Sequence, residues 1–464
     1  MRIPCCIDVP EEFLQKARYG VKMLLLPFRV EPKWTSSDRL EGGGIYYGMD
    51  AELVSASAWR IGLLESTVDF FASGEHEPPS ARMVTIGGVD LPVLFESDGD
   101  SPFDLVAATF YFLAGWQENT SMVRDEHGRF LFSESIQSRH NLATIPVVDL
   151  YRKLLQQELV RRGVQLERKQ WNEKTWAFCP THDIDCLKKW RPGIVYREVV
   201  ERALFNAEKE TLRARGSRIG LAVAGLLKHH DPYANTIKRM RDEVANRGGK
   251  ATYFFKTAAR GPNDVRYNEN ASFLHRQYLE LRNLNFEIGL HPSYHAYNHG
   301  RYLREERAAL RRATGIEATS SRTHFLRFDP AATPRLLADT GFQIDSSLGF
   351  AEQEGFRRGT CLPFPLYDLE ADQSLKLWEM PLVVMEGTLF NRRHLQVDEA
   401  ISASNELMAT CKAFGGVFVG LWHNFLWDEH DFPGWAQHFI ACLDQARKED
   451  GLATSLRSAL KAWK

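Results

Sequence analysis

Residues 176–185 read WAFCPTHDID, a short apolar run that ends in two acidic residues, Asp183 and Asp185. A run of this length and character is typical of a strand that is buried on both faces of a parallel sheet. Six comparable runs follow it, at residues 250–258, 286–294, 317–328, 342–348, 378–386 and 416–424. Helix-length segments separate most of them, and this alternation favours a parallel α/β fold. The sequence therefore predicts a distorted (β/α) barrel with about seven parallel strands over residues 174–464.

Polar side chains fall at the carboxyl ends of these runs. They are Asp183, Asp185, His291, Arg322, Asp345, Glu386 and His423. In a (β/α) barrel the carboxyl ends of all strands meet at one rim, which is where catalytic groups lie. We therefore expect the functional site at that rim.

The first 165 residues have a different texture, with short apolar runs between turn signals and two helical patterns at residues 101–118 and 147–163. They predict a smaller N-terminal α/β domain over residues 1–165. Its residues form no catalytic constellation, so its role stays open.

Residues 190–231 are long for the first connection of a barrel, and they predict a helical insertion at the rim. A basic cluster of Arg213, Arg215 and Arg218 lies near the apolar stretch 219–227. The insertion is interpreted either as a lid or a docking surface at the rim, or as a helix pair packed on the outside of the barrel with no functional role. Its basic cluster also leaves contact with a membrane surface or a protein open.

Charge and hydropathy exclude some classes of protein. The chain has 58 Lys and Arg against 60 Asp and Glu, a net charge of −2, which argues against a nucleic-acid partner. The N-terminus MRIPCCIDVPEEF has no basic start followed by an apolar run, and no apolar run reaches the ~20 residues of a spanning helix. We expect no transmembrane segment and a cytoplasmic location.

The stretch HPSYH at residues 291–295 supplies two histidines near the predicted rim. Pro292 suits the first position of a helix, so His295 is expected in the first helical turn, on the same face as His291. A carboxylate from a neighbouring strand end would complete a His₂Asp set with positions open for water, as catalytic zinc sites have.

Together these motifs resemble the polysaccharide deacetylase family, which is carbohydrate esterase family 4 or the NodB-homology domain. The resemblance is carried in chain order by residues 181–185, by His291 with His295, by residues 320–350 and by residues 417–424. It covers about residues 174–430. It implies a metal-dependent hydrolase that removes N-acetyl groups from a sugar or glycan, and a role in polysaccharide biosynthesis.

The resemblance also implies roles for individual residues. Asp185, His291 and His295 would bind the metal, and Asp183 would be the general base. Zinc is the default ion for these ligands, while nickel, cobalt and iron suit the same set.

Four further residues complete the expected site. Arg322 would keep Asp183 ionised through a charge-assisted hydrogen bond, although Arg327 competes for this role because the usual prolines after the arginine are absent. His423 would be the general acid. Glu386 would orient His423, since the Asp-Trp pair of the family's fourth motif is missing here.

Alternatives to this interpretation remain open. The chain could be a non-catalytic carbohydrate-binding or assembly protein that reuses the fold, or a hydrolase of the same mechanism that acts on a non-sugar C–N bond. If it is an enzyme, the cytoplasmic expectation favours sugar-nucleotide or lipid-linked glycan substrates. We interpret His324, which follows Arg322 in the sequence, as structural.

Overall fold

The computed structural model describes residues 1–40, 43–80, 82–190 and 231–463. The predicted helical insertion at residues 190–231 lies almost entirely outside the described residues. The centre of the fold is a curled, mostly parallel sheet with the strand order β12-β13-β11-β10-β9-β8-β7-β15-β14, with β16 beside β7.

Strands β7 to β11, β14 and β15 lie within the predicted runs, whereas β12 and β16 lie outside them and β13 begins before one. The strands are β7 (Ala177–Ile184), β8 (Thr252–Phe255), β9 (Glu287–Leu290), β10 (Ser320–Ser321), β11 (Ile344–Asp345), β12 (Phe364–Asp368), β13 (Gln373–Glu379), β14 (Leu382–Met385), β15 (Val417–Leu421) and β16 (Leu452–Ala453). Every residue of β7 is buried, as expected for a strand covered on both faces. The parallel α/β class is therefore as predicted.

The sheet has ten strands, so the expected count of about seven needs correction. The run at 378–386 is divided: β13 ends at Glu379 and pairs with β11, whereas β14 begins at Leu382 and pairs with β15. Pro381 lies at the break and has no N–H to donate to a ladder. The antiparallel strand β12 and the short strand β16 make up the difference.

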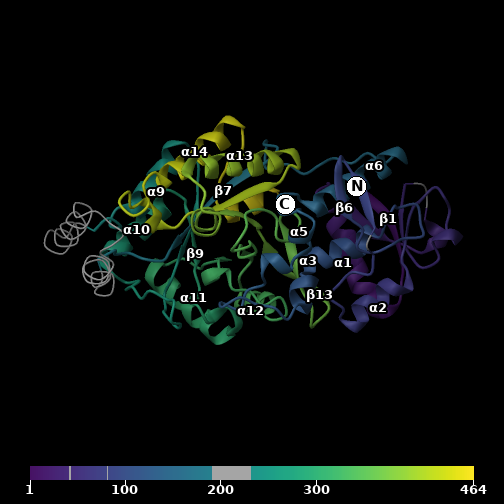
Figure 1. Cartoon of the computed structure of the whole chain (residues 1–464), viewed down its shortest axis with the longest axis horizontal. Helices are drawn as coiled ribbons and strands as arrows, with labels where there is room; N and C mark the ends of the chain where they lie inside the picture. Colours follow the sequence, from purple (N-terminus) through teal and green to yellow (C-terminus); the bar gives the residue numbers. More distant parts are fainter. Residues whose placement is uncertain (41–42, 81, 191–230, 464) are drawn as a thin grey trace, which may run out of the picture.

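Helices cover the outside of the curled sheet (Figure 1). They are α9 (Thr236–Asn246), α10 (Ser272–Asn283), α11 (Gly300–Thr314), α12 (Thr333–Thr340), α13 (Val397–Ala413), α14 (Trp435–Lys448) and α15 (Leu456–Trp463). Each has an apolar face toward the sheet. On α11, for example, Leu303 and Leu310 are one heptad apart and both are fully buried.

The N-terminal region has a four-stranded parallel sheet of its own and a two-stranded hairpin. The strands are β1 (Arg2–Asp8), β2 (Glu31–Trp34), β3 (Ile45–Gly48), β4 (Trp59–Gly62), β5 (Met83–Ile86) and β6 (Val89–Pro92). The α-helices are α1 (Leu14–Leu25), α2 (Glu65–Ser73), α3 (Leu105–Ala114), α4 (Trp116–Thr120), α5 (Ile136–Arg139) and α6 (Val147–Arg161). The two helical patterns predicted here correspond to α3 with α4 and to α6.

Buried polar contacts join the N-terminal region to the curled sheet. The carboxylate of Glu118 pairs with Arg357 at 2.7 Å and with Arg358 at 3.1 Å, and all three side chains are at most 2% exposed. The hydroxyl of Tyr19 donates to the carbonyl of Pro365 at 2.7 Å. One apolar core runs through both regions, so the N-terminal region is packed firmly against the sheet.

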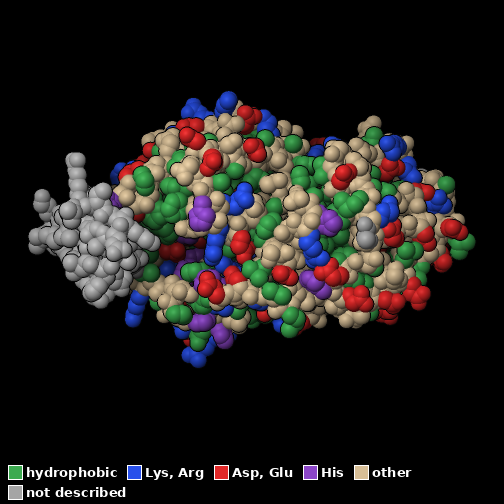
Figure 2. Space-filling view, viewed as in Figure 1, with side chains coloured by type: hydrophobic (Ala, Val, Ile, Leu, Met, Phe, Trp, Pro, Cys, Tyr) green, Lys and Arg blue, Asp and Glu red, His purple; other side chains and the backbone are tan. Residues whose placement is uncertain are grey.

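The surface carries mixed charge. On the face drawn in Figure 2, acidic and basic side chains are interspersed, in keeping with the nearly balanced composition. Within the described residues, no helix combines the length and the apolar character needed to cross a membrane.

Candidate active site

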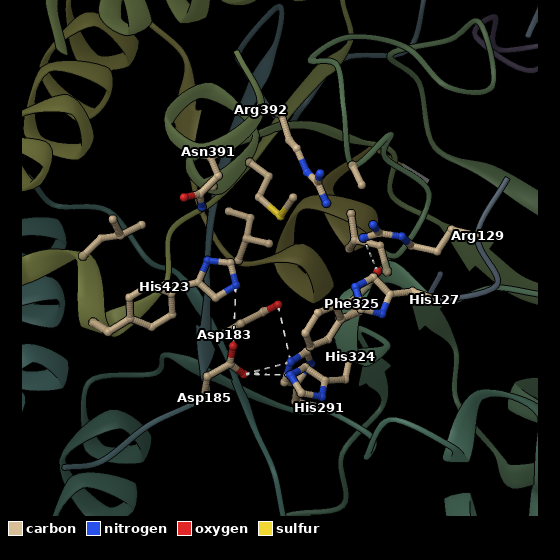
Figure 3. A pocket seen from close by; sticks show the side chains of 17 residues that line it. His127, Arg129, Asp183, Asp185, His291, His324, Phe325, Asn391, Arg392 and His423 are labelled. Carbon is tan, nitrogen blue, oxygen red and sulfur yellow. Dashed lines mark hydrogen bonds and ion pairs between the residues drawn. The ribbon is translucent and has the colours of Figure 1, made fainter. Parts of the chain in front are cut away.

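A cavity of about 440 Å³ lies at the carboxyl ends of the central strands, where the sequence placed the site. Asp183 and Asp185 reach it from the end of β7, two residues apart and therefore on one face of the strand. His291 follows β9, His324 follows β10 and His423 follows β15, and all three line the same cavity (Figure 3).

Asp185, His291 and His324 offer one ligand atom each within 4.8 Å of one another. The Nε2 atom of His291 lies 3.2 Å from Oδ1 of Asp185, and Nε2 of His324 lies 3.7 Å from the same oxygen. Two imidazoles and one carboxylate are the ligand set of a catalytic divalent-metal site, and three protein ligands leave room for water.

The Nδ1 atoms of both histidines already have hydrogen-bond partners. Nδ1 of His291 lies 2.6 Å from the carbonyl oxygen of Arg322, and Nδ1 of His324 lies 2.7 Å from a carboxylate oxygen of Asp264. Each Nδ1–H therefore donates, which leaves the lone pair of Nε2 directed at Asp185, as in histidines that bind metals.

Unpaired polar atoms test whether a cation fits these residues. Nε2 of His291 and Oδ1 of Asp185 are buried and have no hydrogen-bond partner, although buried polar atoms almost always have one. A divalent cation would satisfy both. The donor set and its outer contacts therefore fit a metal ion.

His295 needs a correction, because the structure does not bring it into this group. Its Nδ1 lies 3.4 Å from a guanidinium nitrogen of Arg327, and its ring packs against Tyr294. The α-helix predicted to follow Pro292 begins only at Gly300, so His291 and His295 are not one helical turn apart. The group contains His324 in place of His295, and the sequence interpretation treated His324 as structural.

The backbone around His324 is unusual. The next two residues, Phe325 and Leu326, have φ values of 61° and 55°, a left-handed conformation that is costly for such side chains. Strained backbone of this kind is concentrated at functional sites. The signal available in the sequence was position alone, since His324 lies two residues after Arg322, within the predicted run at 317–328.

Asp183, the expected base, is 3% exposed and lies beside the metal-ligand group. One of its oxygens, Oδ2, is 3.7 Å from Nε2 of His291, and the other, Oδ1, is 3.9 Å from a guanidinium nitrogen of Arg322. The contact with Arg322 is an ion pair and is too long for the hydrogen bond that we expected. Arg322 donates instead to Thr181 and Ser346.

Arg327, the rival to Arg322, points elsewhere. It donates to the carbonyl oxygens of His127 and Tyr294, both at 2.7 Å, and its guanidinium group lies over the rings of Tyr294 and Tyr297. These contacts fasten two loops together. Between the two arginines, the structure places only Arg322 against Asp183.

His423 and Glu386 lie together as the sequence suggested. Nδ1 of His423 is 2.7 Å from Oε1 of Glu386, and the backbone N–H of His423 donates to the same oxygen. Burial opposes a charged ring, but the negative charge of Glu386 and its hydrogen bond outweigh burial and raise the pKa of His423 to about 9. His423 is therefore protonated at neutral pH.

A lysine at the site was not anticipated. Nζ of Lys256, directly after β8, lies 3.7 Å from Oδ1 of Asp185 and is 2% exposed. Burial favours the neutral form of Asp185, but Lys256, His324 and His291 outweigh it and hold the pKa of that carboxyl well below its usual range. Asp185 is ionised and can act as a ligand, while Lys256 offsets part of its charge.

Comparisons with known proteins separate the two regions of the chain. Residues 26–163 match a family of unknown function, DUF7033. The comparison with curated proteins gives no match.

Solved structures similar to the chain are deacetylases or relatives of them. A Mycobacterium smegmatis protein described as a polysaccharide deacetylase aligns at 16% identity and a TM-score of 0.40, over 62% of this chain and 90% of its own. The Bc1960 peptidoglycan N-acetylglucosamine deacetylase aligns at 12% and 0.31, over 62% and 89%. A mutant of BA3943, a CE4-family pseudoenzyme with restored activity, aligns at 9% and 0.28, over 62% and 68%. Since these TM-scores are below 0.5, the functional argument rests on the site itself.

Proposed function

We propose that the chain is a metal-dependent hydrolase that removes N-acetyl groups from a sugar or glycan. The observation that carries the proposal is the convergence of Asp185, His291 and His324 beside Asp183 and His423, with Nε2 of His291 lacking a hydrogen-bond partner among the described residues. Zinc is the first choice for this ligand set, and nickel, cobalt or iron would also suit it. When bound, such an ion would supply Lewis acidity, which polarises an amide carbonyl and acidifies a water molecule.

The residues of the chain divide the proton transfers between them. Asp183, which lies beside the guanidinium of Arg322, takes the proton of the attacking water. His423, kept protonated by Glu386, gives a proton to the departing amine nitrogen, which is too basic to leave as an anion. Base and acid thus enter one cavity from neighbouring strands, β7 and β15.

The surroundings of Asp183 support its role as the general base. Asp183 is nearly enclosed, with 4% of its side chain exposed, and Oδ1 has no hydrogen-bond partner within the described structure. The two oxygens of Asp183 have different surroundings: Oδ1 faces Arg322 at 3.9 Å, and Oδ2 faces Nε2 of His291 at 3.7 Å. Oδ2, on the side of the metal-ligand group, is the oxygen placed to accept a proton from water.

Acetate release tests the proposal. The purified chain, loaded with Zn²⁺, is offered N-acetylated oligosaccharides and sugar nucleotides, with Asp183→Asn as the matched control that keeps the side-chain shape. We expect release by the wild type and a loss of at least about 100-fold in the variant, the lower end of a general base's contribution. Equal release by both proteins would remove Asp183 from its role.

Metal content gives an independent check of the site. We expect one equivalent of bound metal in the wild type and much less in Asp185→Ala. A wild-type chain that binds glycans but neither retains a metal ion nor releases acetate would be a carbohydrate-binding or assembly protein instead. The cytoplasmic location and the role in polysaccharide biosynthesis remain part of this proposal.

A further inference from the structure

The N-terminal region forms part of the cavity wall that lies opposite Asp183 and Asp185. A loop at residues 124–130 brings His127 and Arg129 to it, and the turn after β14 brings Asn391 and Arg392. Figure 3 shows the guanidinium groups of Arg129 and Arg392 on the same side of the cavity, opposite the two aspartates.

Arg129 is fixed in place and still has donors to spare. It is 7% exposed, its Nε and one terminal nitrogen contact Asp125 at 2.7 Å, and its other terminal nitrogen donates to the carbonyl of Phe325 at 3.1 Å. A guanidinium group has five N–H donors, and these contacts use three of them. Two N–H groups therefore remain for a ligand in the cavity.

Arg392 has no counter-ion among the described residues. Its neighbour Arg393 pairs with Glu354 at 3.3 Å, whereas Arg392 itself is exposed toward the cavity. The only acidic residues that line the cavity are Asp183 and Asp185, which contact the histidines and Lys256. The far wall is thus positively charged and its charge is only partly neutralised.

We propose that Arg129 and Arg392 form a subsite for an acidic substituent of the substrate, a carboxylate or a phosphate group, with Asn391 beside it. This proposal rests on the proposed function and adds a substrate class to it. Two guanidinium groups that face one space are suited to planar carboxylates and to phosphates, which they bind by charge-assisted hydrogen bonds. The N-terminal region then has a task, since its loop supplies half of the subsite.

The position of the two arginines also orients the substrate. The metal-ligand set lies at one end of the cavity and Arg129 with Arg392 at the other, so an acidic group bound by the arginines leaves the rest of the sugar to extend toward the metal-ligand set. This orientation places the anion at Arg392 and leaves the acetamido group at the end with Asp183. A neutral sugar gains nothing from the far wall.

Binding measurements with defined sugars test the subsite. Isothermal titration compares N-acetylglucosamine 1-phosphate and N-acetylmuramic acid, which carry a phosphate and a carboxylate, with neutral N-acetylglucosamine. Arg392→Gln is the main variant, because that side chain is exposed and its loss leaves no partner unpaired. Arg393→Gln is the matched control. It removes the same charge at the next position in the sequence, but the side chain of Arg393 does not line the cavity.

We expect at least one acidic sugar to bind more tightly than the neutral one, and Arg392→Gln to weaken that binding by about 10-fold to 100-fold, the usual value of a charged hydrogen bond. Arg392→Glu should weaken it further. The neutral sugar and the control variant should show no change. Which acidic sugar responds identifies the group as a phosphate or a carboxylate.

Two results would overturn the subsite: equal affinity for acidic and neutral sugars, or equal losses in Arg392→Gln and Arg393→Gln. These failures are distinct from failure of the proposed function. Acetate release from neutral glycans with no Arg392 dependence would keep the hydrolase and reject the subsite. Arg392-dependent binding of an acidic sugar without any acetate release would keep the subsite and reject the hydrolase.

Discussion

Replacing His324 by alanine is the sharpest test of the metal site, because the sequence pattern and the structure name different third ligands. The structure places Nε2 of His324 3.7 Å from Oδ1 of Asp185, whereas His295 contacts Arg327. We therefore expect His324→Ala to lose metal affinity and His295→Ala, the matched control, to keep it. The family pattern predicts the opposite result.

The size of the effect can be bounded from the outer contact of His324. Loss of an outer-shell partner typically costs about 10-fold to 100-fold in metal affinity, about 1.4 to 2.7 kcal/mol. Asp264→Asn weakens such a partner, the carboxylate 2.7 Å from Nδ1 of His324, so we expect about 10-fold. Removing the ligand itself should cost more than about 100-fold.

Competition with a chromophoric chelator measures Zn²⁺ affinity for the wild type and the three variants at constant pH. Thermal unfolding of each apo-protein confirms that the variants are folded. If His295→Ala weakened binding as much as the family pattern implies, while His324→Ala did not, the assignment of the third ligand would be refuted. Equal affinity in all four proteins would mean that no metal is held at this place.

Three further predictions follow from buried charges. Burial lowers the pKa of His182 to about 3 and that of His438 to about 4, so in acid the unfolded chain takes up protons that the folded chain excludes. The stability that the neutral histidines contribute is present above pH ~6.5 and is lost as the pH falls toward these values, by about 2 kcal/mol per histidine at pH 5. Urea unfolding at pH 7 and at pH 5 would show this loss. Lys256→Met removes a cation 3.7 Å from Asp185, and unit charges at this range interact by about 4 kcal/mol. Because this cation repels a metal ion at Asp185, Zn²⁺ should bind at least about 10-fold more tightly to the variant. Weaker binding would contradict this expectation. Glu118→Gln leaves Arg357 with a buried, uncompensated charge and should lower the free energy of unfolding by about 3 to 5 kcal/mol, and an unchanged urea midpoint would contradict it.

Much of the fold follows from local pattern. The run at 176–185 begins with apolar residues and becomes the fully buried strand β7, and Asp183, Asp185, His291 and His423 reach one cavity because parallel strands share their carboxyl edge. The pairing of strands does not follow from local pattern in the same way. Pro381 is a local signal for a break within residues 378–386, but nothing local shows that the two parts pair at distant positions of the sheet.

The candidate ligand set likewise could be predicted only where local sequence fixes the position of a side chain. Spacing identified His291, because a strand end fixes where its ring lies. Spacing failed for His295, because its position depends on where the next helix starts, and Asp264 and Glu306 hold the intervening loop open by accepting the backbone N–H groups of Tyr294 and Ser293. Those acids are remote in sequence, so the loop conformation is a tertiary effect.

The N-terminal region influences the metal ligands as well as the far wall of the cavity. Arg129 donates to the carbonyl of Phe325, and Arg327 donates to the carbonyl of His127, so contacts with the loop at 124–130 hold both ends of the short segment that begins with His324. The left-handed backbone at Phe325 is costly and persists only where surrounding contacts fix it. Because the same loop carries Arg129 into the cavity, the proposed ligand role of His324 and the proposed recognition of an acidic group both depend on the conformation of residues 124–130.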